Sequence, residues 1–317
     1  MAGVLRERLP RRAMRSLFID ICEQEVITTD MYNKESFPGR PGGRLETLDL
    51  VRGVTLVSMI LYHGMWDFLY LSERGASMEA LRTWYEGAGG HLWQQSICRT
   101  FILLSGFCVP FSRHIFRRGL EISAGGIAVS AVTVIALYED RILFGVLTFL
   151  GAAMLATGAL QRAFADSSSS PSGNSAATVR ASAAGLAVCL FLFHLTRWIN
   201  LGYLRIGPRI RMDLPSGLYT FGSGTFWGYL LTGLGFTTKG FFSTDYFSFL
   251  PWIFLFWTGL FFHRLLAAAG QRSGTGRLFD STAFHLCLPF FNLIGRHSLF
   301  VYLIHQPLLY LLTMIVF

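Results

Sequence analysis

Long apolar runs separated by short, arginine-rich polar segments are the main pattern of this 317-residue sequence. A helix needs about 20 mostly apolar residues to cross the hydrocarbon core of a bilayer. We expect such helices at residues 47–71, 95–113, 120–138, 141–161, 180–199, 248–268 and 297–316. The pattern therefore predicts an all-α fold, a polytopic membrane bundle of about seven or eight transmembrane helices.

The stretch at residues 218–236 leaves the number of spans open. It is apolar and aromatic, but it contains five glycines, which weaken a continuous helix. It is either a full span, a re-entrant segment or a broken helix that lines a cavity, because irregular backbone at membrane depth must be covered by protein or water. We favour seven spans with a re-entrant segment over eight spans.

Two polar segments interrupt this organisation. Residues 1–43 are polar and basic, and we interpret them as a disordered cytoplasmic tail or as an extension upstream of an initiator at Met14 or Met31. Residues 44–317 form the predicted transmembrane domain. Within it, the serine-rich segment 166–175 has the composition of a flexible linker.

Composition and charge support a membrane protein. Hydrophobic residues make up 52% and charged residues 15% of the chain, whereas soluble domains carry about 25% charged residues. The net charge of +8 does not indicate nucleic-acid binding, because the arginine clusters lie between apolar runs, as in cytoplasmic loops. This places the N-terminus in the cytoplasm, although the arginines of the 197–211 loop depart from the rule. The five scattered cysteines show no metal-binding or disulfide spacing, and we expect no metal.

Four polar residues align along the first predicted helix. At 100° per residue they fall within roughly a 60° wedge: Asp49, Arg52, His63 and Asp67. Polar side chains inside a membrane are costly and indicate function by default. His63 lies about 16 Å beyond Arg52, near the midplane. Asp67 follows one turn later and is positioned to orient the imidazole; the structural alternative is a His–Asp hydrogen bond that joins helices.

The last predicted helix carries a second histidine at a similar depth. His305 lies about 13.5 Å along the axis from Arg296, and Tyr302 shares its face. Pro307 removes a backbone donor and allows the helix to bend around a site. The alternative is a kinked helix with a satisfied core histidine. We therefore expect the imidazoles of His63 and His305 to converge inside the bilayer.

Arg99 lies deep in the second predicted helix and needs an anionic partner. Asp67 is the candidate at the nearest depth. We assign Arg99 and Asp49 to the polar core of the bundle, where a structural ion pair is the alternative to a catalytic role for Arg99.

From about residue 44 onwards the chain resembles the bacterial branch of the heparan-alpha-glucosaminide N-acetyltransferase catalytic-domain family, within the transmembrane acyltransferase group. Six segments carry the resemblance: RLETLDLVRG (44–53), YHGMWDFLYL (62–71), RTFILLSGF (99–107), FGVLTFLGAAML (144–155), DYFSFLPW (245–252) and GRHSLFVYLIHQPLL (295–309). In the related acyltransferase-three family an Arg-Gly pair precedes an essential histidine at the spacing of Arg52, Gly53 and His63. The resemblance therefore implies that His63 is essential.

The resemblance implies an enzyme that moves an acyl group, acetyl in our interpretation, from cytoplasmic acyl-CoA to a sugar-type hydroxyl or amine across the membrane. His63, oriented by Asp67, would act as general base, and His305 or Tyr302 would stabilise the oxyanion or move the proton. An acyl-histidine intermediate and direct transfer both stay open. Arginines near the cytoplasmic face would bind the acyl-CoA phosphates: Arg52, Arg113, Arg117, Arg118 and Arg296.

Two other functions are compatible with the residues. A proton-coupled transporter would use the His/Asp/Arg stripe as a relay, and a structural membrane protein would use it only for packing. We expect membrane lipid, acyl-CoA and a sugar-type acceptor as partners, no nucleic acid, and a location in the bacterial cytoplasmic membrane.

Overall fold

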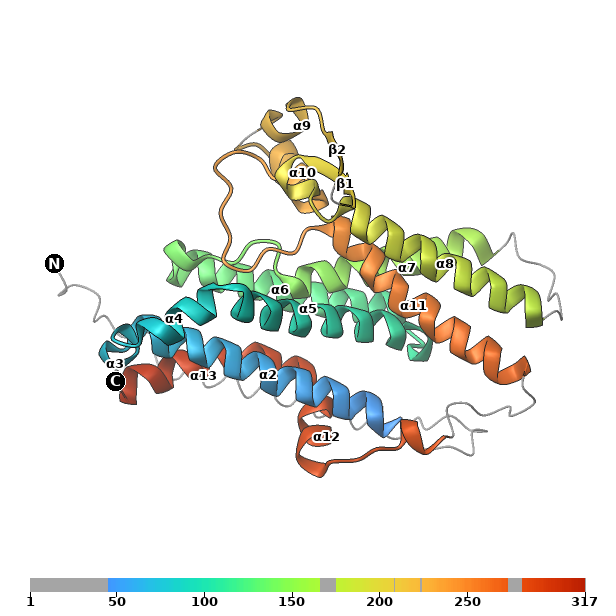
Figure 1. Ribbon diagram of the computed structural model, residues 1–317, viewed down its shortest axis with the longest axis horizontal. Coiled ribbons are helices and arrows are strands. Elements are labelled where there is room, and N and C mark those ends of the chain that lie inside the picture. Colours follow the sequence, from blue (N-terminus) through green and yellow to red (C-terminus); the bar gives the residue numbers. More distant parts are fainter. Residues whose placement is uncertain (1–44, 166–174, 208, 223, 273–280, 317) are drawn as a thin grey trace.

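The computed structural model describes residues 45–165, 175–207, 209–222, 224–272 and 281–316 (Figure 1). The predicted tail at residues 1–43 and nearly all of the serine-rich segment 166–175 lie outside the described residues. Our interpretation of those two segments therefore stays a prediction.

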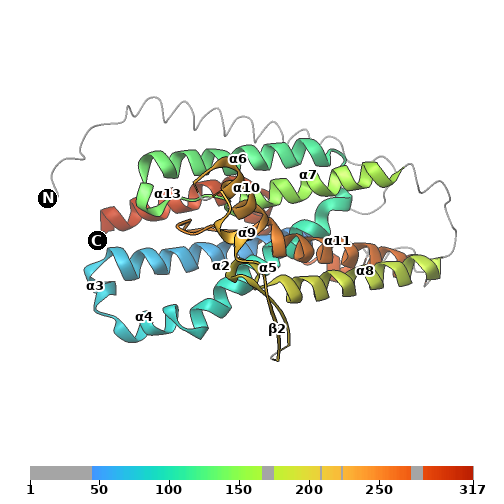
Figure 2. The same cartoon turned by 90° about the horizontal axis from the view of Figure 1, so that it is seen from above.

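Among the described residues, the long helices run side by side, mostly along the long axis of the molecule (Figures 1 and 2). They overlap the seven expected apolar runs: α2 (Glu46–Leu71), α5 (Ala88–Cys108), α6 (Ile115–Ala136), α7 (Val146–Ala165), α8 (Ser175–Thr196), α11 (Phe249–Arg272) and α13 (Ser298–Val316). Within the described residues, five helices are long and apolar enough to cross a membrane, in α2, α6, α7, α8 and α11, and α13 contains a shorter apolar helix. The expected all-α membrane bundle is confirmed.

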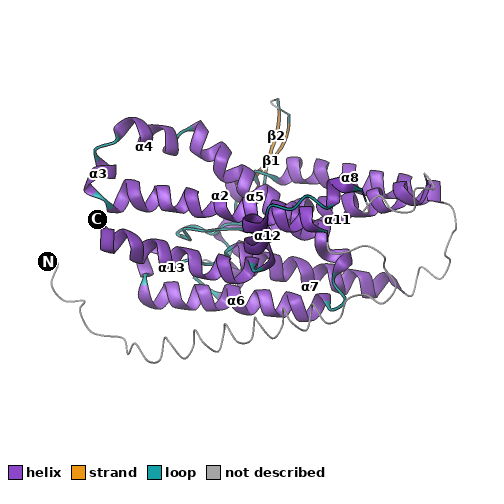
Figure 3. Ribbon diagram, turned by 90° about the horizontal axis from the view of Figure 1, so that it is seen from below, coloured by secondary structure: helices purple, strands orange, loops and turns teal. Residues whose placement is uncertain are grey.

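Short elements connect the long helices (Figure 3). They are α3 (Glu73–Ala76), α4 (Glu79–Glu86), the antiparallel hairpin of β1 (Tyr203–Ile206) and β2 (Ile210–Asp213), α9 (Gly217–Thr220), α10 (Phe226–Leu234) and α12 (Pro289–Arg296). The hairpin, α9 and α10 gather beside the ends of α8 and α11, and α12 lies beside the start of α2 (Figure 1).

The ambiguous stretch 218–236 does not form a full span. Its main helix, α10, has 9 residues, which gives a length of only about 13.5 Å. Gly222, Gly224 and Gly235 adopt positive φ angles of 64°, 76° and 126°, a conformation that interrupts a right-handed helix. The eight-span alternative is therefore wrong, and the glycines are the reason.

The arginine-rich segments meet on one side of the bundle, as expected. The start of α2, the end of α5 and the start of α6 all lie toward the right of Figure 1, and α12 packs against α2 nearer the middle. We call this the basic side, because it carries Arg52, Arg118 and Arg296. Its assignment to the cytoplasm stays a prediction.

Glycine brings backbones into direct contact at several helix crossings, including those between α5 and α11 and between α2 and α12. A Cβ at Gly106 of α5 would lie 1.8 Å from the Phe256 carbonyl oxygen of α11, and one at Gly259 would lie 2.0 Å from the Leu103 carbonyl oxygen. Small residues allow such close approach between membrane helices. Together with Ile102 and Phe256, both fully buried, this crossing builds the main core between α5 and α11.

The second crossing joins α2 to α12. A Cβ at Gly53 would lie 1.9 Å from the Phe291 carbonyl oxygen, and one at Gly295 would lie 1.9 Å from the Asp49 carbonyl oxygen. The Asn292 amide of α12 also donates to the Glu46 carbonyl oxygen at 2.7 Å. Because α13 begins directly after α12, this contact sets how α13 lies against α2.

Candidate functional site

His63 of α2 and His305 of α13 come together inside the bundle. Their ring centroids are 5.2 Å apart with an interplanar angle of 52°. His305 is buried and His63 is partly buried. The two histidines that the sequence places at similar depths therefore do converge.

The hydrogen bond of His305 fixes which ring nitrogen is basic. Nδ1 lies 2.6 Å from the Tyr302 carbonyl oxygen. A carbonyl only accepts, so Nδ1 carries the proton and Nε2 keeps its lone pair. Nε2 is buried and has no hydrogen-bond partner in the described part of the chain. It is thus positioned to accept a proton.

Tyr302 packs against His305 and against an aromatic ring of α5. Its ring centroid lies 5.5 Å from that of His305 and 6.2 Å from that of Phe101 on α5, with which it is stacked. Tyr302 of α13 therefore contacts both His305 and α5, and its catalytic role stays a prediction.

The predicted contacts of Asp67 are not formed. Asp67 is fully buried, yet neither carboxylate oxygen has a hydrogen-bond partner among the described residues. It therefore neither orients His63 nor pairs with Arg99, which donates instead to Gln95 Oε1 at 3.2 Å. The reason is that one-turn spacing places two residues on one helix face without bringing their polar atoms together. A catalytic role for Asp67 stays a prediction.

An ionic cluster lies on the basic side, about 16 Å along α2 from His63. Arg52 Nη1 lies 3.1 Å and Arg296 Nε 3.8 Å from the carboxylate oxygens of Asp49, which is buried. Arg52 also donates to Cys108 Sγ at 3.3 Å. One carboxylate therefore serves two guanidinium groups, and the cluster keeps a net positive charge that favours anions.

The other three arginines predicted to bind phosphate are exposed near the start of α6. Arg117 pairs with Glu121 at 2.9 Å, a solvated contact that contributes little stability. Arg118 acts electrostatically on Cys108, which places it near the ionic cluster. Arg113 lies at the surface just before α6.

Asp245, in the loop before α11, was missed by the sequence analysis. Its Oδ2 accepts a hydrogen bond from the Val146 N–H at 3.3 Å. Burial raises the pKa of Asp245 to about 6. The only available signal was its place in DYFSFLPW, because a loop residue has no helical periodicity.

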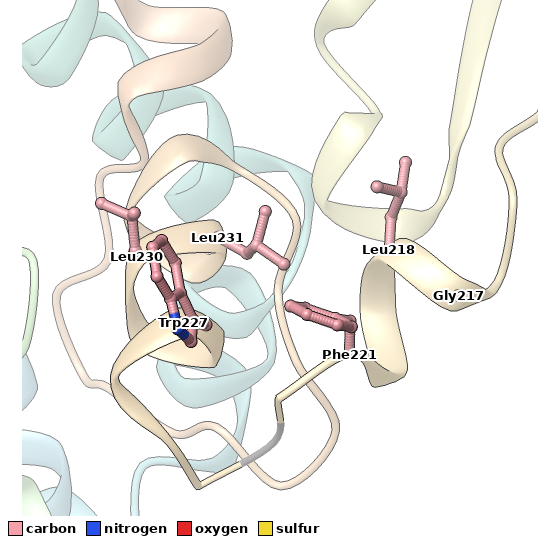
Figure 4. A pocket seen from close by; sticks show the side chains of 6 residues that line it. All are labelled: Gly217, Leu218, Phe221, Trp227, Leu230 and Leu231. Carbon is pink, nitrogen blue, oxygen red and sulfur yellow. The ribbon is translucent and has the colours of Figure 1, made fainter.

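An open apolar groove lies elsewhere, between α9 and α10 (Figure 4). It has a volume of about 560 Å³ and is lined by Gly217, Leu218, Phe221, Trp227, Leu230 and Leu231. No titratable side chain lines it, so it does not supply acid–base chemistry. The described residues also contain no group of three His, Cys, Asp or Glu arranged to hold a metal ion.

One comparison with known proteins bears on this site. The family model described as heparan-alpha-glucosaminide N-acetyltransferase, catalytic, matches residues 44–307. That range includes both histidines and the ionic cluster on the basic side. No curated protein and no solved structure matches the chain. Because the match covers most of the sequence, the chain belongs to the heparan-alpha-glucosaminide N-acetyltransferase catalytic family, a family of membrane acetyltransferases.

Proposed function

We propose that the protein transfers an acetyl group from acetyl-CoA, bound at the basic side, to a hydroxyl or amine of a sugar-type acceptor that enters from the opposite side. The family supplies the reaction class. The observation that supports the proposal best is the contact between His63 and His305, with ring centroids 5.2 Å apart, deep in the bundle.

The donor would bind with its phosphates at the ionic cluster of Asp49, Arg52 and Arg296. Guanidinium groups bind phosphate well because their donors are planar and paired. The thioester would then extend along α2 toward His63, about 16 Å deeper, a separation that suits the extended pantetheine arm of CoA. In this arrangement Asp49 bridges the two arginines, and a phosphate of the donor would replace part of its contact with them.

The chemistry is nucleophilic attack by the acceptor oxygen or nitrogen on the thioester carbonyl carbon. A new C–O or C–N bond forms, the C–S bond breaks, and the CoA thiolate leaves. His63 takes the proton from the acceptor, a contribution of about 10²–10⁴-fold. The proton then passes to the thiolate, which leaves as the thiol.

The tautomer of His305 indicates which residue transfers the proton and which stabilises the oxyanion. Its Nε2 carries no proton, so His305 can relay the proton from His63 to the thiolate rather than donate to an oxyanion. Tyr302, whose hydroxyl is a donor, is then the residue that stabilises the oxyanion. We therefore assign proton transfer to His305 and oxyanion stabilisation to Tyr302, two roles that the sequence left open between them.

The proposal is tested with purified protein in detergent. Acetyl-CoA should raise the thermal midpoint more than ADP does at the same concentration, because ADP offers phosphates to the ionic cluster but lacks the acyl-pantetheine arm. Radiolabelled acetyl-CoA incubated with a panel of amino sugars and neutral sugars should yield acetylated product. The His63→Ala variant should keep the stabilisation by acetyl-CoA and lose transfer at least 100-fold, and His91→Ala, an exposed histidine of α5, should behave as wild type. Normal transfer by His63→Ala would refute the proposed mechanism.

One observation favours a second function. The buried carboxylate of Asp67 has no partner among the described residues, as a site that takes up and releases protons requires. A proton-coupled transporter would show substrate-dependent proton uptake in liposomes without any acyl donor, and that uptake would be lost in Asp67→Asn.

A further inference from the structure

The hairpin of β1 and β2 carries arginines at the end of the bundle where the sequence pattern does not expect them. Helix α8 begins toward the right of Figure 1 and ends at the hairpin, away from the basic side. The segment at residues 197–213 contains four arginines and one aspartate, a net charge of +3. Arginine-rich loops normally lie on one side of a membrane bundle, so a positive charge at the other end has to be stabilised locally.

The two faces of the hairpin differ in chemistry. Side chains alternate between the faces of a strand, so residues that pair across the ladder share a face. One face, which we call the arginine face, carries Arg205 directly opposite Arg211. The other, which we call the apolar face, contains four apolar side chains in two cross-strand pairs: Leu204 with Met212, and Ile206 with Ile210. The hairpin is therefore amphipathic.

The apolar face is largely uncovered by the rest of the protein. The exposed fractions of Ile206, Ile210 and Met212 are 42%, 55% and 58%, and all four residues of β2 are exposed. An isolated two-stranded hairpin is at best marginally stable in water, so this face needs another apolar surface. The preceding helix α8 is long and apolar enough to cross a membrane, and the acyl chains of the surrounding bilayer offer such a surface at its end.

The arginine face keeps an excess of positive charge. Like charges at directly opposed positions destabilise a sheet, and Arg205 and Arg211 are such a pair. Arg211 Nε donates to Asp213 Oδ1 at 2.7 Å, whereas Arg205 Nε donates to the neutral Gly207 carbonyl oxygen at 2.9 Å. Arg209, exposed between the two strands, adds a third guanidinium group. Within the described residues of the hairpin, one carboxylate serves three guanidinium groups, and this excess favours phosphate.

Aromatic rings typical of a membrane interface stack at the base of the hairpin. The rings of Trp198 and Tyr203 are stacked, with centroids 6.0 Å apart and an interplanar angle of 13°. The Arg211 guanidinium lies 4.0 Å from the Tyr203 centroid, and that of Arg197 lies 5.3 Å from the Trp198 centroid. Trp and Tyr are enriched where a membrane meets water, and arginine can reach phosphates there while its stem lies on apolar surface.

We propose that the β1–β2 hairpin lies in the membrane interface, with its apolar face among the acyl chains and its arginines bound to the phosphates of anionic phospholipids. Binding of this kind depends on buried apolar area together with attraction to anionic lipid. Each arginine near an anionic membrane surface strengthens binding about fivefold. The lipid phosphates then stabilise the arginines that depart from the usual distribution of charge. This surface is independent of acetyl transfer.

The test measures amide hydrogen exchange in the hairpin of the full-length protein, reconstituted at one copy per nanodisc. The discs contain phosphatidylcholine alone or mixed with increasing fractions of anionic phosphatidylglycerol. Arg209→Gln and Arg211→Gln each remove one charge from the hairpin, and Met212→Ser makes the apolar face more polar. The matched control is Arg74→Gln, an exposed arginine of α3 whose loss lowers the net charge equally. Helix content and a single elution peak establish that each variant is folded.

We expect phosphatidylglycerol to slow exchange of the hairpin amides in the wild type, because exchange requires local opening and docking on the membrane opposes it. Each arginine variant should lower the apparent affinity for phosphatidylglycerol about fivefold. Met212→Ser should exchange faster than the wild type at every lipid composition, and Arg74→Gln should match the wild type.

The inference is overturned if the hairpin exchanges equally in phosphatidylcholine alone and in the mixtures, because its arginines would then have no anionic lipid partner. It is also overturned if Arg74→Gln weakens the response as much as the hairpin variants do, which would indicate an effect of net charge. Slow exchange only in discs that hold two copies would indicate a contact between copies of the chain and would likewise overturn it.

Discussion

The glycine contact between α2 and α12 yields a prediction that links packing to catalysis. Gly295→Ala would place a Cβ 1.9 Å from the Asp49 carbonyl oxygen and 3.0 Å from the Gly53 nitrogen. Contacts shorter than 3.0 Å essentially do not occur for real Cβ atoms, so α12 must move away from α2 by about 1 Å. Both partners are backbone, and no change of rotamer relieves the clash.

The energetic cost follows from overpacking. Extra methyl groups in a packed core typically cost about 1–3 kcal/mol, and a backbone clash belongs at the upper end, about 3 kcal/mol. The movement also carries α13, which begins at Ser298 directly after α12. It therefore changes the 5.2 Å contact between His63 and His305. A misplacement of about 1 Å can lower a reaction rate about 100-fold.

Two assays on purified protein check this prediction. Gly295→Ala should unfold several degrees below the wild type and transfer acetyl groups about 100-fold more slowly. The control is Gly125→Ala on α6, where the nearest atom to an added Cβ is Leu147 Cδ1 at 3.9 Å, and this variant should match or exceed the wild type in stability. If Gly295→Ala and Gly125→Ala are indistinguishable in both assays, the α2–α12 contact does not position the site.

Three further predictions concern single polar groups. Burial raises the pKa of Asp245 to about 6, so wild-type stability should fall as the pH rises from about 4 through about 6, by at most about 3 kcal/mol. Asp245→Asn, which keeps an acceptor for the Val146 N–H, should lose this pH dependence in thermal scans. Equal slopes of stability against pH for the variant and the wild type would contradict this prediction. Asp49→Asn removes the carboxylate that bridges Arg52 and Arg296, so the unliganded protein should lose about 1–3 kcal/mol of stability. Acetyl-CoA binding should tighten in titration calorimetry, because no carboxylate then competes with phosphate for the arginines; weaker binding would show that Asp49 helps to hold the donor. The Trp257 indole N–H donates to the Thr157 hydroxyl at 2.9 Å, and Thr157→Val removes this acceptor. The variant should lose about 1–3 kcal/mol of unfolding free energy in denaturant titrations, whereas Thr157→Ser, which keeps the hydroxyl, should not.

The sequence predicts the long helices well because apolar length is a direct requirement of the bilayer. Helix α5 is the main exception, since it begins at Ala88 rather than near residue 95. Its first turns carry polar residues such as Gln94, and apolarity marks the part of a helix in lipid rather than the whole helix. The stretch 218–236 was ambiguous for the opposite reason, because apolar composition there coincides with glycines at positive φ angles.

The site was predictable only where depth along a helix determines contact. The depths of His63 and His305 could be compared because the axial distance of each from a basic residue, Arg52 or Arg296, follows from the helical rise per residue. The isolated carboxylate of Asp67 could not be foreseen, because helical spacing fixes the face of a residue and not its hydrogen bonds. The contact of Asp245 with Val146 depends on a loop and on the packing of distant segments, which carry no periodic signal.

Transfer across a reconstituted membrane tests the central claim most directly. Proteoliposomes would hold an amino sugar acceptor inside, with radiolabelled acetyl-CoA outside and the basic side of the protein facing out. The account predicts that label reaches the enclosed acceptor with the wild type and with His91→Ala, and that His63→Ala lowers this at least 100-fold while acetyl-CoA still binds. Equal labelling of the enclosed acceptor by His63→Ala and the wild type would contradict it.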